Sequence, residues 1–399
     1  MSYITAKEAA ERWGISLRYV QRLLLEQRIP GARKYQRSWL VPADADKPED
    51  LRKREKRGTP RTVYLPYRTP VPLMTQLYAV PGRTDLIPEI QQQGNNELAA
   101  LCGCQLSYFR GEIETAQKKA GALYADASCL DAKLGALFVL SSCAVYSGAV
   151  RQWNKLEAAL AGMRAASAQD QSYIAFCRAG IWSKLWDTTH FPDWLRGGCF
   201  DPLPGESYPL ARFYYLKFLL LTKIRETPKS DFTAAAEPLI SQTKLEGIVI
   251  SEAYLRLLAA IAYHSDGNDK AALVHIERAL ALLLPDRLYM PLAECSRALD
   301  FLLLRALRTV DRTAYECVVS LNKRMMEGWT LLHNAVLQRN ATNVWTVRER
   351  EIVKLAVRGL TNKQIAERLR ISVNTVKQRL GVAMEKVNVK KRKDLARFF

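Results

Sequence analysis

The chain has 399 residues, enough for two or three domains, and its 48% apolar and 25% charged residues exclude wholesale disorder. Its formal net charge of +19 is unusual, and the excess lies at the two ends. Residues 1–68 hold 16 basic and 8 acidic side chains, residues 339–399 hold 16 and 5, and the remaining 27 basic and 27 acidic side chains balance. Two basic ends around a neutral middle indicate two places where a polyanion binds.

Each basic end contains a copy of one short segment. TAKEAAERWGISLRYVQRLL (5–24) and TNKQIAERLRISVNTVKQRL (361–380) align without gaps and are identical at nine of 20 positions. Both copies have the residues that begin two helices and the apolar residue (Ile15 or Ile371) that fills the turn between them. The expected caps are Thr5 with Glu8 and then Ser16 in the first copy, and Thr361 with Gln364 and then Ser372 in the second. This spacing is that of a helix-turn-helix.

The second helix of each copy is predicted to have one apolar stripe and one polar face. The stripes are Leu17, Val20 and Leu24 in the first copy, and Val373, Val376, Leu380, Ala383 and Val387 in the second. The polar faces are Arg18, Gln21 and Arg22 with Tyr19 beside them, and Asn374, Lys377 and Gln378 with Gly381. Such side chains hydrogen-bond base edges and phosphates, so both copies predict DNA binding rather than a solvated hairpin.

Residues 28–42 follow the first helix pair and predict a β-hairpin that turns near Tyr35–Ser38. Trp39 is expected to plug the small core. Arg33, Lys34 and Arg37 would lie at the tip of this wing, within reach of phosphates or of the minor groove. Residues 43–70 read as a linker, and six prolines between Pro60 and Pro88 discourage regular structure. The basic run at 52–57 is either an arm along DNA or a solvated helix face.

The middle of the chain, roughly residues 90–335, predicts antiparallel helix pairs. Aromatic residues shortly before Gly111, Gly148 and Gly267 mark expected turns, and ALVHIERALALLL (272–284) is an amphipathic helix. The aromatic-rich stretch 182–215 is expected to be mainly core, with a groove for a signal molecule as the minority interpretation. The uncharged stretch 134–150 is predicted to be a buried helix rather than a membrane span. The eight cysteines are expected to be reduced and buried, as in a cytoplasmic protein.

No catalytic or metal-binding motif is present. The four histidines form no H-E-x-x-H pair and no cysteine cluster at metal spacing, and no G-x-S-x-G, G-x-G-x-x-G after a strand or G-x-x-x-x-G-K-[ST] occurs. We therefore expect no enzyme, no metal site, no cofactor and no nucleotide-driven switch.

The last 55 residues resemble the LuxR-type helix-turn-helix domain. The motifs are T-x-R-E-R-E-I (346–352), G-x-[ST]-N-K-x-I-A (359–366), I-S-x-x-T-V-K (371–377) and K-V-x-V-x-x-R (386–392). The resemblance implies four helices, the third in the major groove, with DNA contacts at Asn362, Lys363, Asn374, Thr375, Lys377 and Gln378. Two positions depart from the family. Arg379 replaces a usual His, which is expected to change phosphate contacts, and Ala383 replaces a usual Ile in the core.

Two further resemblances cover the rest of the chain. Residues 3–48, with ITAKEAAERWGIS, R-I-P-G and RSWLVP, resemble the small winged helix-turn-helix of excisionase and MerR-like proteins. The middle is similar to the tetratricopeptide-like sensor region of MalT-type regulators. The expected fold is mainly α, a helical-hairpin body flanked by these two domains. The expected boundaries are 1–48 for the winged domain, 49–89 for a basic, Pro-rich linker, 90–335 for the body and 339–399 for the LuxR-type domain.

The sequence thus predicts a cytoplasmic, sequence-specific regulator of transcription that binds double-stranded DNA, with no membrane partner. The body would sense a small molecule or a protein, and the LuxR resemblance suggests a homodimer on paired half-sites. Two alternatives remain open. One is an architectural protein that bridges distant DNA sites, and the other is a helical interaction scaffold for which DNA binding is secondary.

Overall fold

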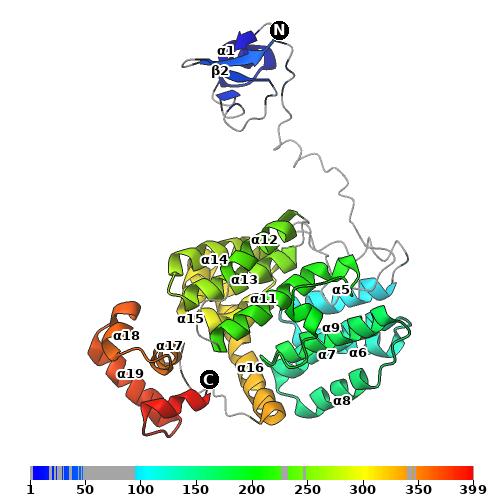
Figure 1. The fold of residues 1–399 in the computed structure, drawn as a ribbon, viewed down its shortest axis with the longest axis vertical. Helices are drawn as coiled ribbons and strands as arrows, with labels where there is room; N and C mark the ends of the chain where they lie inside the picture. Colours follow the sequence, from blue (N-terminus) through cyan, green and yellow to red (C-terminus); the bar gives the residue numbers. More distant parts are fainter. Residues whose placement is uncertain are drawn as a thin grey trace. The chain divides into compact units, whose positions relative to one another are not determined.

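The computed structural model describes residues 3–17, 20–21, 24, 29, 31–35, 38–43, 45, 47, 94, 96–225, 232–245, 249–338, 345 and 347–398. The chain divides into two compact units, residues 1–64 and 65–399, and each is considered by itself. Most of the described residues are helical, as the sequence predicts (Figure 1). The predicted linker at 49–89 lies outside the described residues.

The first unit contains a small antiparallel sheet of strand order β1-β3-β2. β2 (Arg33–Tyr35) and β3 (Ser38–Pro42) pair with Tyr35 opposite Ser38, which confirms the predicted β-hairpin. β1 (Tyr3–Thr5) pairs with the other edge of β3, where Ile4 lies opposite Val41. The third strand was not predicted from the sequence, because three residues are too few to show an alternating pattern.

Helix α1 (Ala6–Trp13) begins at Thr5 with the predicted capping box and ends at Gly14, whose φ of +63° is left-handed. The second helix of the hairpin contributes Val20 and Leu24 to the core of this unit, which they share with Trp13 and Val41. Trp39 was predicted to fill this core. It is instead half-buried and packs against the outside of the core.

The body in the second unit is built from consecutive helices that pack in pairs, as predicted. Figure 1 shows α13 (Val249–Ser265) beside α14 (Asp269–Leu283), and α15 (Met290–Val310) packs along α16 (Arg312–Leu337) in the same way. The earlier helices are α5 (Asn96–Phe109), α6 (Ile113–Asp126), α7 (Leu130–Ser147), α8 (Val150–Ala161), α9 (Ala168–Ser183), α10 (Asp193–Arg196), α11 (Tyr208–Arg225) and α12 (Phe232–Leu245). Two short 3-10 helices lie in this part of the chain. η1 (Gly205–Ser207) precedes α11, and η2 (Leu284–Asp286) follows α14.

The three predicted aromatic–glycine turns are confirmed. Helices α5, α7 and α13 end just before Gly111, Gly148 and Gly267, and all three glycines have a positive φ of +84°, +69° and +82°. This left-handed conformation costs other residues energy, so glycine favours a sharp turn into the next helix. A Cβ on Gly148 would also lie 3.1 Å from the backbone of Gly328, so α16 can approach α7 closely at this point.

Helix α7 ends at Ser147 and includes most of the uncharged stretch 134–150. It is long and apolar enough to cross a bilayer, yet 67% of its 18 residues are buried inside the body, which is typical of a core helix. Of the eight cysteines, Cys102, Cys104, Cys143, Cys177 and Cys295 are buried. The prediction of uniform burial is wrong for Cys199, which is exposed, and for Cys129 and Cys317, which are only partly covered.

Candidate nucleic-acid interface

The C-terminal part of the chain folds as a small helical domain. It contains α17 (Val347–Val357), α18 (Asn362–Leu369), α19 (Val373–Lys386) and the 3-10 helix η3 (Arg392–Phe398). The resemblance implied four helices, and the fourth is a 3-10 rather than an α-helix. Helices α18 and α19 form the predicted helix-turn-helix.

Caps fix the start of α18 and the turn that leads from α18 into α19. Thr361 accepts a hydrogen bond from the backbone of Gln364, whose amide oxygen accepts one in return from Thr361 N at 2.8 Å, so the predicted capping box is confirmed. Ser372 caps α19 by accepting from Thr375 N at 3.0 Å. Between them Arg370 adopts a left-handed φ of +51°. The entry of α19 is therefore set by local hydrogen bonds that the sequence encodes.

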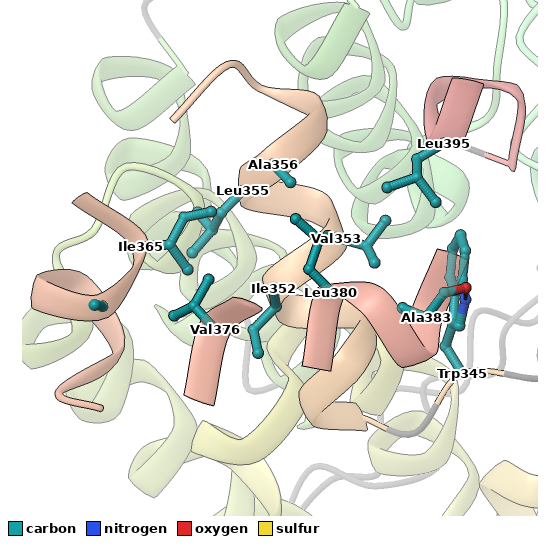
Figure 2. Close-up of a cluster of buried hydrophobic side chains, with 11 residues drawn as sticks. Trp345, Ile352, Val353, Leu355, Ala356, Ile365, Val376, Leu380, Ala383 and Leu395 are labelled. Carbon is teal, nitrogen blue, oxygen red and sulfur yellow. Dashed lines mark hydrogen bonds between the residues drawn. The ribbon is translucent and has the colours of Figure 1, made fainter. Parts of the chain in front are cut away.

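The buried side of α19 packs on α17 and α18 around one apolar core (Figure 2). Val376, Leu380 and Ala383 are buried on this side, as the stripe predicts. Trp345 lies beside Ala383 in this core. The indole Nε1 of Trp345 donates to the Ala383 carbonyl at 2.7 Å, and the tryptophan itself is buried.

The prediction that the first residue of each apolar stripe lies in the core is wrong. Val373 is 39% exposed, and Leu17, which occupies the same place in the first unit, is 40% exposed. Both follow the serine that caps the helix in the alignment.

The face of α19 opposite the core is polar and open to solvent. Asn374, Lys377, Gln378 and Arg379 are all exposed, as is Gly381 on the same side. Thr375 is half-buried, and its hydroxyl lies 2.8 Å from that of Ser372 at the start of the helix. The residues that the sequence placed on one face are therefore brought together on one helix, at a surface that is free to meet a groove.

The R-E-R-E motif acts inside the domain. Arg348 pairs with Glu351 at 2.5 Å and donates to the carbonyl of Leu369 at 2.9 Å, which ties the start of α17 to the end of α18. Glu349, which is buried, pairs with Lys386 at 2.7 Å near the end of α19. These ion pairs hold the three helices in register and use acidic side chains that would otherwise repel DNA.

Arg392 organises the junction between α17 and α18, and its importance was not recognised from the sequence. Its guanidinium donates to the carbonyls of Ala356 (3.1 Å) and Leu360, and to Oδ1 of Asn362 at 3.2 Å. Asn362 is therefore half-buried and held by Arg392, while its amide nitrogen remains the group that can donate to a phosphate. Lys363 beside it is exposed. The K-V-x-V-x-x-R motif ends on Arg392 and was the available signal.

Charge pairing leaves the surface of this domain strongly basic. The 61 residues from 339 hold 16 basic and 5 acidic side chains. Three of the acids are paired internally: Glu349, Glu351 and Asp394, the last with Arg397 at 3.7 Å. Lys363 on α18 and Lys377 and Arg379 on α19 are exposed, so these two helices present positive charge to solvent, which favours a polyanion.

In the first unit, the structure describes one side chain of the predicted DNA-contacting set. Gln21 is exposed, as predicted for its polar face. Arg33 and Lys34 lie on β2 of the wing, with only their backbone described, while Arg18, Tyr19, Arg22 and Arg37 lie outside the described residues. Among the residues that the structure describes, no group of three or more His, Cys, Asp or Glu side chains is arranged to hold a metal ion.

Comparison with known proteins agrees with this geometry. Residues 343–399 match the family of bacterial regulatory proteins described as the luxR family. No curated protein and no solved structure matches the chain. The match covers α17, α18, α19 and η3, so the C-terminal domain is a LuxR-type helix-turn-helix domain, and it supports a DNA-binding regulator of transcription.

Proposed function

We propose that this protein is a cytoplasmic, sequence-specific regulator of transcription that reads double-stranded DNA with helix α19. The observation behind the proposal is the exposed polar face of α19 within the domain that matches the luxR family. Lys377 and Gln378 would contact base edges in the major groove, with Asn374, Thr375 and Arg379 beside them. Asn362 and Lys363, at the start of α18, would hold phosphates, and a helix N-terminus favours such an anion.

The first unit would be a second DNA-binding end of the excisionase or MerR-like winged type. Its support is the repeated helix-turn-helix, the wing of β2 and β3, and the basic composition of residues 1–68. Arg18 and Arg22 would reach a groove with Tyr19 and Gln21, and Arg33, Lys34 and Arg37 would hold phosphates.

The body, about residues 90–335, would be a tetratricopeptide-like sensor that passes a signal to the DNA-binding ends. Its support is the run of paired helices with glycine turns. A homodimer on paired half-sites fits the usual use of such domains, since two-fold symmetry in the protein is mirrored in the operator.

The test is selection of genomic fragments bound by the full-length protein at about physiological salt with excess competitor DNA. Salt must be controlled, because basic ends bind any DNA when it is low. A recurrent motif near gene starts is expected, and the spacing of its half-sites reports the geometry of the dimer. Broad occupancy with looping between fragments would overturn promoter control and indicate an architectural protein that bridges DNA.

A further inference from the structure

The end of helix α13 meets two arginines of the LuxR-type domain. The last four carbonyl groups of an α-helix have no donor within the helix, and the partial negative charge there favours cations. The carbonyl of Ser265, the last residue of α13, accepts a hydrogen bond from Arg358 Nη1 at 3.1 Å and one from Arg368 Nη2 at 3.4 Å. The His264 carbonyl accepts a longer bond from Arg368 Nη2, at 3.5 Å. Two side chains of the DNA-binding domain therefore cap a helix of the body.

The turn after α13 leaves room for one of these arginines. Gly267 has a left-handed φ of +82°, and a Cβ added there would lie 2.8 Å from Nη2 of Arg368 and 3.0 Å from its Cζ. A side chain at this position would push the guanidinium away from the carbonyls that it caps. Glycine at 267 therefore permits both the sharp turn into α14 and the close approach of Arg368.

The charges at this contact are complementary. Burial and the neighbouring charge of Arg368 both lower the pKa of Arg358 from its usual value, and the carboxylate of Asp266 in the turn counteracts them. The three charged groups therefore lie close enough to influence one another. Two basic side chains of a strongly basic domain meet an acidic turn, on a body whose charges otherwise balance.

A second contact lies beside the first. Helix α17 packs on α15, and α15 packs on α13. Glu294 on α15 accepts hydrogen bonds from Tyr254 on α13, at 2.7 Å, and from Tyr108 on α5. The two helices that hold the LuxR-type domain are therefore joined to each other inside the body. A shift of α13 against α15 would move the arginine contacts relative to α17, and so would turn the domain.

The contact leaves the DNA-reading face open. Arg358 directly follows α17, and Arg368 lies near the end of α18. On α19, by contrast, Asn374, Lys377 and Gln378 are exposed in the same arrangement. The body therefore holds the domain without covering its polar face, so the contact can set the orientation of α19 rather than block it.

The arginine contacts are weak enough to be broken. Both arginines are exposed, and their bonds go to neutral carbonyls at 3.1–3.5 Å. Each arginine should shift the balance between attached and released domain by about two- to tenfold. A contact of this strength responds to small changes in the body, which a permanent domain interface would not.

We propose that the end of α13 and the turn into α14 are a docking site for the LuxR-type domain of the same chain. Arg358 and Arg368 hold the domain there in one orientation, with α19 open to DNA. The regulatory meaning rests on the proposed function, because the body would pass its signal by moving this site. Docking itself does not depend on DNA binding.

The experiment measures how the LuxR-type domain tumbles in the full-length protein, from NMR relaxation of backbone amides in α17, α18 and α19 compared with amides of the body. In the wild type we expect one common tumbling time. Arg358→Glu combined with Arg368→Glu places two carboxylates against the end of α13 and Asp266, so the domain should reorient independently and its tumbling time should shorten. Arg151→Glu combined with Lys155→Glu, on the exposed side of α8, makes the same change in charge and should tumble as the wild type does.

Gly267→Ala is the second variant, and it keeps every charge. Its methyl group displaces the flexible end of Arg368, so the attached state should be weakened about two- to tenfold. The matched control is Gly111→Ala, which has the same left-handed strain at a φ of +84° and meets the side chain of Leu321 inside the body instead. This control should leave the tumbling of the LuxR-type domain unchanged.

Two results would overturn the proposal. One is a wild-type domain that already tumbles independently of the body, and the other is a charge-reversed domain that stays attached as firmly as the wild type. Binding of duplex DNA is measured on the same samples. Gly267→Ala should bind a single DNA site as the wild type does, because α19 is open in the docked state. Absence of DNA binding by the wild type would contradict the proposed function alone, whereas independent tumbling with intact DNA binding would contradict the docking site alone.

Discussion

The two aligned segments at opposite ends of the chain have the same first helix and the same turn after it, although fewer than half of their residues are identical. In both, a threonine opens the first helix with a capping box, and the helix ends on a left-handed residue whose N–H returns to the previous turn. Ile15 N then donates to Ala10 O at 3.1 Å, and Ile371 N to Ala366 O at 3.0 Å. The comparison teaches that caps and spacing define this motif, while most other positions are free to vary.

The differences between the copies concern charge and strain. Gly14 occupies the left-handed position of the first copy, and Arg370 that of the second. The capping box uses the titratable Glu8 in the first and the neutral Gln364 in the second. On the exposed face, Gln21 of the first aligns with Lys377 of the second. Each difference predicts a different response to one change made in both copies.

The largest expected effect concerns the two aligned core leucines. Leu24→Ala and Leu380→Ala each leave a cavity in a small core, since both leucines are buried, and should cost about 2–5 kcal/mol of local stability. Hydrogen exchange of the full chain, resolved by segment, measures both. Leu17→Ala and Val373→Ala are the controls and should cost less than about 0.5 kcal/mol, because these side chains are exposed. A large loss in either control would contradict the shared exposure of the first stripe position.

The next effect concerns DNA affinity. Lys377→Ala should weaken specific binding by about 1–3 kcal/mol if the side chain meets a base edge, and should reduce the salt slope by about 1 if it meets a phosphate. Gln21→Ala in the other copy removes no charge, so it should leave the salt slope unchanged. Binding isotherms at several salt concentrations measure both quantities. Lys118→Ala, on an exposed face of α6, is the charge-matched control. An affinity equal to the wild type at low and moderate salt would remove Lys377 from the interface.

Sequence reasoning succeeded where the determining residues are close together in the chain. The capping boxes, the αL turns after aromatic residues and the two-strand wing depend on contacts within a few positions, so they could be predicted. The polar face of α19 follows from helical periodicity in the same way.

The features that were missed depend on contacts distant in the sequence. Arg392 reaches back to Ala356, 36 residues earlier, and Tyr108 meets Glu294 across 186 residues. Apart from the motif that ends on Arg392, nothing local distinguishes these side chains from solvated ones, and one sequence contains no signal of which helices will meet. The same applies to β1, because its three residues are recognisable as a strand only from their pairing with β3.

A smaller effect is expected at the left-handed positions. Gly14→Ala should destabilise the first hairpin by about 1–2 kcal/mol from backbone strain alone, because no atom lies within 4 Å of the added Cβ. Arg370→Gly should relieve the same strain in the second hairpin, and the gain should stay below about 1 kcal/mol because glycine is freer in the unfolded chain. Segment-resolved hydrogen exchange again measures both changes. A loss of stability in Arg370→Gly would show that the arginine makes a favourable interaction that outweighs its strain.

The smallest expected effect separates the two capping boxes by pH. The Glu8 carboxylate accepts from Thr5 N at 2.7 Å and from the Thr5 hydroxyl at 2.9 Å, and these bonds lower the pKa of Glu8 below its usual 4.5. A carboxyl whose pKa is lower in the folded state stabilises that state above its unfolded pKa, and the contribution is lost as the pH falls through the folded value. Gln364 makes the same two bonds to Thr361 without titrating. The amide resonance of Thr5 should therefore shift with a midpoint below 4.5, while that of Thr361 stays unchanged, and Glu8→Gln should abolish the difference. Equal acid shifts at Thr5 and Thr361 would show that the pH response comes from general unfolding. The titration of Glu8 would then not distinguish its capping box from that of Gln364.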